Sequence, residues 1–143
     1  MSTKFYTSDQ VVVSLGTIPI NTGRGEDVFV KITPMNPAFT SKVGADGEVA
    51  RSRSNDRRHK IEITTLQTSD ANLLLSILHQ LDLNAPNGAG VAAILIEDMG
   101  GTSVFAAPEC WIVEAPEVEY GAEVKERTWK LEAATPLNMV GGN

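Results

Sequence analysis

Short runs rich in β-branched residues recur along almost the whole chain, and each is bounded by Gly, Asn or Pro. Runs of this kind predict β-strands. The clearest one alternates Ile61 and Ile63 with Glu62 and Thr64, so one side of that strand faces a core and the other does not. Six or seven strands are expected, within residues 10–20, 26–34, 61–66, 91–98, 102–108, 109–121 and 123–136.

A chain of 143 residues, 42% of them hydrophobic, can bury one core without metals or disulfides. We therefore expect a single domain over residues 1–143. It should be mainly β, a two-sheet sandwich or partly rolled barrel with one flanking α-helix. The segments "NTGRG" and "MGG" read as hairpin turns, and Pro116 as a bend or strand edge. Residues 137–143 are expected to form a flexible tail.

One leucine-rich segment, "TSDANLLLSILHQLDLNAPNG", breaks the β pattern and predicts a helix over residues 69–83, with Thr68 or Ser69 as N-cap. The residues expected to pack in the core at helical spacing, together with a tryptophan of the last strand, are Leu74, Ile77, Leu78, Leu81 and Trp129. Leu73 and Leu75 flank this face and make it wider than one sheet can cover. A second surface is therefore expected over the helix, either a loop of the same chain or a neighbouring subunit.

Residues 40–58, "TSKVGADGEVARSRSNDRR", contain almost no large apolar side chain, carry the turn sequence "GADG" and hold five basic residues. We predict a long loop or arm, with a short strand possible at residues 48–51. Connections of this length are uncommon in compact domains, and they are usually functional or ordered by a partner. A mobile surface loop without a partner remains the alternative.

Several sequence features indicate the compartment in which the protein folds. Cys110, the single cysteine, cannot close an intrachain disulfide, and its apolar neighbours predict a buried, inert thiol. The first ten residues have no apolar stretch of signal-peptide length, and no run approaches the roughly 20 apolar residues that span a bilayer. We expect a protein that is made and folded in a reducing cytoplasm.

Charge is segregated along the chain, whose formal net charge is -6. Residues 1–60 hold nine Lys or Arg and six Asp or Glu, whereas residues 61–124 hold ten acids and no Lys or Arg. The net charge argues against a simple nucleic-acid binder. If copies assemble, the cationic arm of one can lie on the acidic surface of the next. A charge run that only keeps the protein soluble is the alternative.

No motif in the sequence predicts catalysis, a metal or a cofactor. His59 and His79 have no Cys, Asp or Glu at metal-ligand spacing, and the glycines of "NTGRGED" and "DMGGTS" do not form a phosphate-binding loop. The acids of "EAPEVEYGAE" could pair for acid–base chemistry, but they are read more simply as a solvated or wall-lining face. An uncharted hydrolase using this acidic strand stays open as one hypothesis, and a small monomeric ligand-binding sandwich as another.

Two blocks resemble a known family. "VGADGEVARSRSNDRRHKIEITTLQTSDANLLLSILHQLD" is similar to the central block of tail tube proteins from contractile-tailed bacteriophages. There, a "GADG" turn and an Arg/Ser/Asn-rich loop lead into a strand ending in "LQTS" and an Asn-Leu-Leu helix. "VAAILIEDMGGTSVFAAPECWIVEAPEVEYGAEVKERTWKLEA" resembles the same family in its Asp-x-x-Gly hairpin, Trp-Ile strand and Arg-x-Trp strand. Together the two blocks cover roughly residues 43–133.

The resemblance implies a β-sandwich with a flanking helix, hexameric rings whose inner sheets join into one barrel, and stacked rings that form a hollow tube for DNA. The tube would be part of the virion, assembled in the host cytoplasm. Its partners would be further copies, the sheath, the baseplate and the tail terminator, with no membrane, cofactor or enzymatic activity. A tube protein of a contractile secretion or bacteriocin-like particle is the nearest rival.

The resemblance also implies roles for particular residues. The long loop would contact the adjacent ring, and the helix would pack near a subunit boundary. The expected inter-subunit or inter-ring contacts are Lys42, Asp46, Glu48, Arg51, Arg53, Arg57 and Arg58. An acidic lumen would repel phosphates and let DNA slide; its candidates are Glu62, Thr64, Glu126, Thr128 and Lys130.

Overall fold

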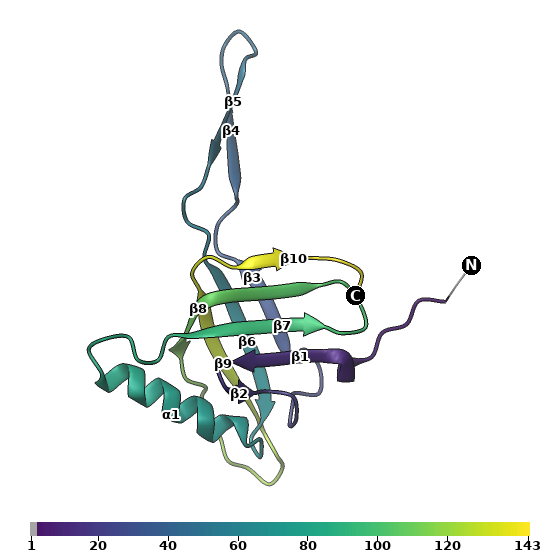
Figure 1. Cartoon of the computed structure of the whole chain (residues 1–143), viewed down its shortest axis with the longest axis vertical. Helices are drawn as coiled ribbons and strands as arrows, with labels where there is room; N and C mark the ends of the chain where they lie inside the picture. The colour runs from purple at the N-terminus through teal and green to yellow at the C-terminus, as the bar shows by residue number, and fades with distance from the viewer. Residues whose placement is uncertain (1–2) are drawn as a thin grey trace.

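The computed structural model describes residues 3–143, in which it has ten strands, one α-helix and a short 3-10 turn (Figure 1). In chain order the elements are the turn Ser8–Gln10, β1 Val11–Leu15, β2 Ile18–Pro19, β3 Val30–Pro34, β4 Phe39–Val43, β5 Val49–Arg53, β6 His59–Leu66, α1 Ala71–Asn84, β7 Ala92–Asp98, β8 Val104–Glu114, β9 Glu126–Ala133 and β10 Leu137–Met139. The predicted fold class, mainly β with one flanking helix, is confirmed.

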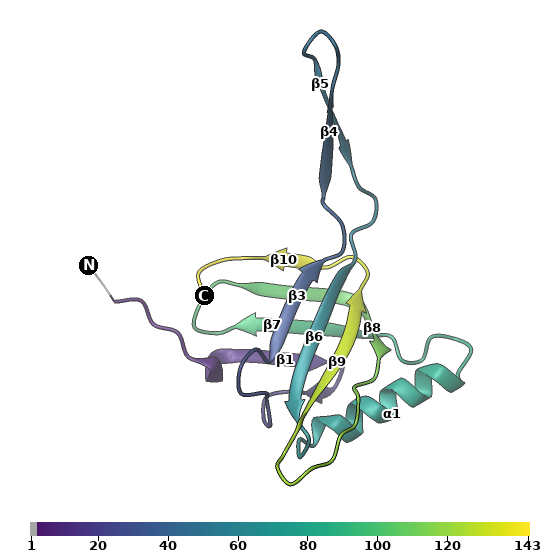
Figure 2. The same ribbon diagram turned by 180° about the vertical axis from the view of Figure 1, so that it is seen from behind.

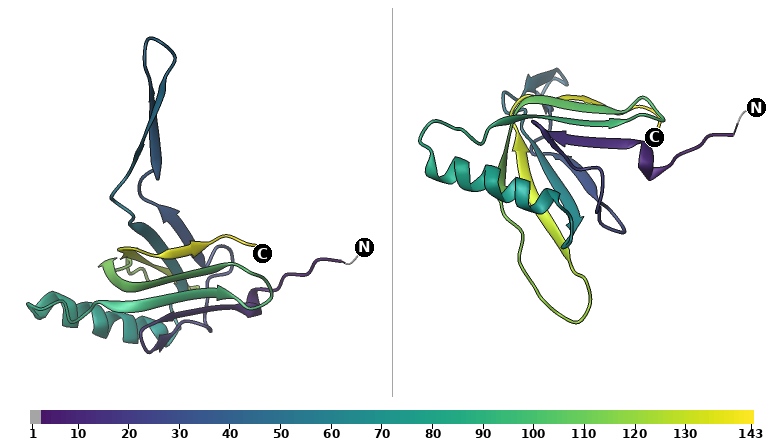
Figure 3. Two further views of the ribbon diagram at one scale, coloured as in Figure 1. Left: turned by 45° about the horizontal axis from the view of Figure 1, so that its top comes forward. Right: turned by 60° about the horizontal axis from the view of Figure 1, so that its bottom comes forward.

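Eight of the strands form one strongly bent sheet in the order β2-β1-β7-β8-β9-β6-β3, with β10 also pairing β8. The first half of β8 pairs with β7 and β10, and its last residues pair with β9. Between Ala107 and Cys110, β8 has one residue more than its partner β7, a bulge that includes Pro108. A bulge bends a strand, and Pro is tolerated there because it has no N–H to pair. The bend folds the sheet into two crossing layers that do not close into a barrel (Figure 3).

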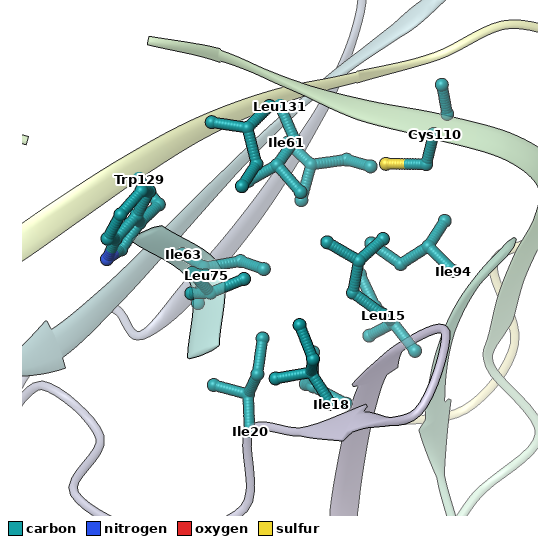
Figure 4. Close-up of a cluster of buried hydrophobic side chains, with 14 of the residues drawn as sticks. Leu15, Ile18, Ile20, Ile61, Ile63, Leu75, Ile94, Cys110, Trp129 and Leu131 are labelled. Carbon is teal, nitrogen blue, oxygen red and sulfur yellow. The ribbon is translucent and has the colours of Figure 1, made fainter. Parts of the chain in front are cut away.

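The hydrophobic core fills the space between these two layers (Figure 4). Leu15 and Ile94 come from the first layer, formed by β2, β1, β7, β10 and the start of β8. Ile61 and Leu131 come from the second layer, formed by the end of β8 with β9, β6 and β3. On β6 and β9 buried and less buried residues alternate, as the sequence predicts. Cys110 is fully buried in this core, and the prediction of a buried thiol is confirmed.

Helix α1 starts and ends within two residues of its predicted bounds, but the face that it buries differs from the predicted one. Leu75 is fully buried and Ala71 nearly so, and Leu78 packs partly against the core. The prediction that Leu74, Ile77 and Leu81 pack in this chain's core is wrong, since their side chains are 42%, 57% and 51% exposed. The segment carries two overlapping apolar stripes, and the side-chain hydrogen bonds of Asn72 to β6 and β9 select the one that turns inward.

Three other segments refine or correct the predictions. Of the loop or arm predicted at residues 40–58, the structure forms an arm, because β4 and β5 pair with each other in register as a hairpin that projects from the body (Figures 1 and 2); β5 includes most of the short strand expected at residues 48–51. The expected flexible tail contains β10, which pairs with the start of β8. The run at residues 10–20 is two short strands, since Gly16, with φ +59°, turns the chain between them.

Candidate assembly surfaces

The hairpin of residues 39–53, called the arm below, stands clear of the body with every residue exposed. Its tip is closed by backbone bonds from Gly44 N–H to Glu48 O at 2.8 Å and from Gly47 N–H to Gly44 O at 3.0 Å. Gly47 has φ +88°, a conformation that favours glycine. An isolated two-stranded hairpin is at best marginally stable in water. A partner that covers the arm would therefore stabilise it.

Five of the predicted contact residues lie on the arm and are exposed: Lys42, Asp46, Glu48, Arg51 and Arg53. The Arg51 guanidinium lies 4.5 Å from the ring centre of Phe39 on the paired strand. This cation–π contact holds one cationic side chain along the arm. In the described part of the chain no ion pair involves Lys42, Arg53 or Arg57. The arm therefore offers unpaired positive charge, and its contact role stays a prediction.

The root of the arm is fixed by charged groups of the same chain. Arg58 Nε and Nη2 each donate to one oxygen of Asp56 at 2.9 Å, and Asn36 Nδ2 donates to Asp56 Oδ2 at 2.6 Å. These bonds, the one from the Arg58 side chain above all, lower the pKa of Asp56 from 3.8 to about 2. The same pairing raises the pKa of Arg58. Arg58 thus anchors its own arm, unlike its neighbour Arg57.

The outward side chains of β3, β6, β9 and the end of β8 make one polar surface, called the polar face below. Two rows of directly opposed residues cross it, Lys31, Glu62, Lys130 and Glu114 in one, and Thr33, Lys60, Glu132 and Trp111 in the other. Lys60 Nζ lies 3.3 Å from Glu62 Oε1, and Lys130 Nζ lies 3.7 Å from Glu114 Oε2. Opposite charges alternate along the first row, so each charge is largely compensated by its neighbours.

All five predicted lumen residues lie on β6 and β9 at positions of the polar face: Glu62, Thr64, Glu126, Thr128 and Lys130. The Thr64 and Thr128 hydroxyls are 3.2 Å apart. With three lysines and four glutamates among its paired rows and Glu126, the face is nearly balanced in charge and is not strongly acidic. Whether it lines a lumen stays a prediction.

The acidic excess lies instead on the β8–β9 connection, residues 115–125, called the acidic loop below. Glu117, Glu119 and Glu123 are all exposed there. The loop returns to the body where the Lys125 N–H donates to Gln67 Oε1 at 2.7 Å and the Gln67 N–H donates to Lys125 O at 2.9 Å. Figures 1 and 2 place this loop at the end of the molecule opposite the arm.

The polar face ends on both sides in an unpaired strand edge. Within residues 3–143, β3 pairs only with β6, and β8 has β9 alone as a neighbour beyond Cys110. These two edges lie on opposite flanks of the same layer (Figure 2). Unpaired edges are sites at which a strand of another copy can add.

Asn72, which the sequence analysis missed, fixes the position of α1. Its Oδ1 accepts from Thr65 Oγ1 at 2.7 Å and from Trp129 Nε1 at 3.0 Å, and its Nδ2 donates to Leu66 O at 2.9 Å. The start of the helix is thereby tied to β6 and β9. The sequence carries no signal for this contact, because Asn72 and Trp129 are far apart along the chain and nothing in their spacing indicates that they meet.

Among residues 3–143, no three His, Cys, Asp or Glu side chains lie where they could hold a metal ion, and no helix is long and apolar enough to cross a membrane. Burial raises the pKa of the Cys110 thiol to about 12, which keeps it protonated and unreactive. The arm and the open strand edges are surfaces suited to contact with other copies.

Comparisons with known proteins agree on one kind of relative. The family model for the bacteriophage PhiTE tail tube protein matches residues 11–141. Structural protein ORF10 of Pseudomonas phage KPP10 is 27% identical over 146 residues, covering 99% of this chain and 84% of that protein.

Solved structures share the fold at low sequence identity. The tube-terminating cap of the anti-feeding prophage aligns with a TM-score of 0.60 at 11% identity, over 97% of this chain and 94% of the cap. A chain of the sheath–tube complex of the PVC extracellular contractile injection system aligns with a TM-score of 0.59 at 12% identity, over 93% and 90%. Its sheath/tube terminator gives 0.58 at 12% identity, over 98% and 100%.

Proposed function

This chain belongs to the bacteriophage PhiTE tail tube protein family, and from that premise we propose that it forms hexameric rings that stack into the DNA-conducting tube of a contractile phage tail. Family membership already makes the chain a structural protein of the phage tail and so a virion component. The proposal of hexameric rings and a DNA-conducting tube rests on the polar face, a four-stranded layer with an open edge on each side.

Ring closure follows from these edges. β3 of one copy can pair with the end of β8 in the next, each segment presenting about the same length of unpaired backbone. Repeated around a ring, this pairing joins the four-stranded layers into one barrel and leaves no edge exposed. The polar face then lines the inside, because the opposite side of each layer carries the core residues Ile61 and Leu131.

A lumen built from the polar face would carry DNA without holding it. Binding of DNA by proteins depends on Lys and Arg that neutralise phosphates. Here each lysine of the first row faces a glutamate, and the threonine hydroxyls bond to each other. The face therefore offers phosphates no excess of positive charge, and charge balance takes the place of the strongly acidic lumen expected from the sequence.

Stacking of rings is proposed to use the two ends of the molecule. Residues 39–58 hold five basic and three acidic side chains, whereas residues 114–126 hold five glutamates and one lysine. The arm projects at one end and the acidic loop lies at the other (Figure 1). An arm of one ring can therefore reach an oppositely charged surface on the adjacent ring. The sheath, the terminator and the baseplate would be the other partners.

A tube that carries no genome is the second candidate. The solved structures with this fold include parts of an extracellular contractile injection system, and they support the fold alone. The relative from a Pseudomonas phage favours the phage tail. Packaged DNA in particles that contain this chain would decide between the two.

Electron microscopy of the purified protein at high concentration tests the proposal. Rings with sixfold symmetry or hollow rods are expected, and a species that stays monomeric at every concentration would contradict it. Reversing Arg53 and Arg57 to Glu should impair stacking while leaving single rings and the β-rich circular dichroism intact. Reversing Lys4, an exposed base outside the arm and its root, serves as the matched control.

The lumen assignment needs its own test. Phage whose tube carries Glu62→Lys and Glu132→Lys should eject DNA more slowly, since the channel would gain unpaired positive charge. Glu97→Lys, on β7 in the other layer, is the matched control. Normal ejection by the double variant, with assembled tails, would remove the polar face from the channel.

A further inference from the structure

Two apolar surfaces have no partner among the residues that the structure describes. The first is the outward side of α1, where Leu74, Ile77 and Leu81 lie at helical spacing and are 42%, 57% and 51% exposed. We call these three residues the helix stripe. A soluble protein rarely exposes a row of large aliphatic side chains on a helix unless another surface covers it.

The second surface is a cleft of about 480 Å³ between β3 and the first layer of the sheet. Its lining is largely apolar, although Asp27 and Asp98 contribute to it. The apolar residues on its two sides include Val28, Ile32, Ile96, Phe105 and Met139. Val28 and Met139 are 58% and 56% exposed, so apolar side chains also stand at the opening.

The two surfaces lie on opposite flanks of the molecule. The cleft is formed where β1 and β8 begin and where β7 and β10 end, on the side of the C-terminus. In both views of Figure 3, α1 lies at the other side of the body. A surface on one flank that matches a different surface on the other flank produces a head-to-tail contact, which closes into a ring when the rotation allows it.

The open strand edges lie on these same flanks. The end of β8 is on the side of α1, and β3 forms one wall of the cleft (Figure 2). The rotation that brings the end of β8 next to β3 of a neighbour therefore also brings the helix stripe toward the neighbour's cleft. We propose that the helix stripe of each copy docks into the cleft of the next copy in the ring. This inference rests on the ring described above and names the side chains that join its subunits.

Cross-linking tests the proposed contact directly. Cys110 can stay in place, because it is fully buried and its thiol is protonated. A chain carrying Leu81→Cys and Met139→Cys, assembled into rings and treated with a short bismaleimide, should give a ladder of covalent multimers up to the ring size. Each single variant is the matched control and should give no ladder.

The outcomes separate this contact from the ring itself. Rings without a ladder in the double variant would overturn the docking and leave the ring standing. Covalent dimers from Leu81→Cys alone would indicate helix-to-helix pairing and would also overturn it. If the unmodified chain never forms rings, the proposed function fails first, and the docking fails with it.

A second measurement does not depend on the reach of a reagent. Ile77→Ser together with Leu81→Ser should raise the concentration needed for ring assembly by about 30-fold, since the half-exposed parts of two aliphatic side chains would lose their apolar partner. Leu83→Ser changes an exposed leucine of α1 outside the stripe and should shift it little. Unchanged ring assembly with weakened sheath binding would assign the stripe to the sheath and overturn the proposal.

Discussion

Replacing Asn72 with Ala should destabilise the monomer by about 2 kcal/mol. Trp129 Nε1, on a side chain only 2% exposed, would lose its acceptor, which costs about 1–3 kcal/mol for a buried donor. The buried Thr65 hydroxyl would keep a weak alternative, Arg127 O at 3.5 Å, and should add about 0.5–1 kcal/mol. Because Ala has a higher helix propensity than Asn, the substitution also stabilises the helix by about 0.5 kcal/mol, which offsets part of this loss.

Urea unfolding below the assembly concentration, followed by tryptophan fluorescence and far-UV circular dichroism, measures this loss. Asn84→Ala is the matched control, because Asn84 makes an exposed bond to Gln80 O at 2.8 Å at the other end of the helix. It should change the free energy of unfolding by less than about 0.5 kcal/mol. If Asn72→Ala cost no more than this control, the hydrogen bonds of Asn72 would not be what orients α1, and the explanation of its buried face would be wrong.

Three further predictions concern single residues. The Cys110 thiol should resist a maleimide at pH 8 in the folded protein and react in urea, since burial raises its pKa to about 12. The Asp56 carboxyl should titrate by NMR near pH 2, so its pairing at the arm root is complete above pH 3.8 and is lost as the pH falls through about 2; Arg58→Ala should move the midpoint upward. Gly23→Ala should cost at least about 1 kcal/mol in the free energy of unfolding, because φ is +65° and the added Cβ would lie 2.8 Å from Ser69 Cβ; an unfolding midpoint equal to that of the unmodified chain would contradict it.

The sequence predicted the parts of the fold whose pattern is created by burial. β6 and β9 alternate apolar and polar residues because one side of each faces the core and the other does not. The polar positions at Glu62, Thr64, Thr128 and Lys130 followed from the same alternation, and the structure brings them together by pairing the two strands in register. These side chains lie close together because each strand alternates apolar and polar residues and because β6 and β9 pair in register.

An arm was predicted at these residues, but its pairing as a two-stranded hairpin was not, for the same physical reason. β4 and β5 bury neither side, so no period of two is imposed on residues 39–53, and only the "GADG" turn signalled a hairpin. β10 is short and lies at an edge, where few contacts constrain its side chains. The face of α1 was mistaken because the stripe that starts at Leu74 is the more apolar in sequence, whereas the one that starts at Leu75 includes His79 and Asp82. Tertiary hydrogen bonds of Asn72, which no local pattern encodes, select between them.

The directions of the unpartnered surfaces determine which polymer they can build. The helix stripe and the cleft lie on opposite flanks, as do the edges of β8 and β3, so contacts between unlike flanks turn each copy relative to the last and can close a ring. The arm and the acidic loop lie instead at the two ends, where a contact between unlike ends repeats without closing. One set of contacts limits growth around the axis and the other permits growth along it. A hollow tube satisfies both, whereas a closed cage would leave arms without a partner. In the proposed tube, every ring would also point the same way, because the basic and acidic segments occupy different ends of the chain's body.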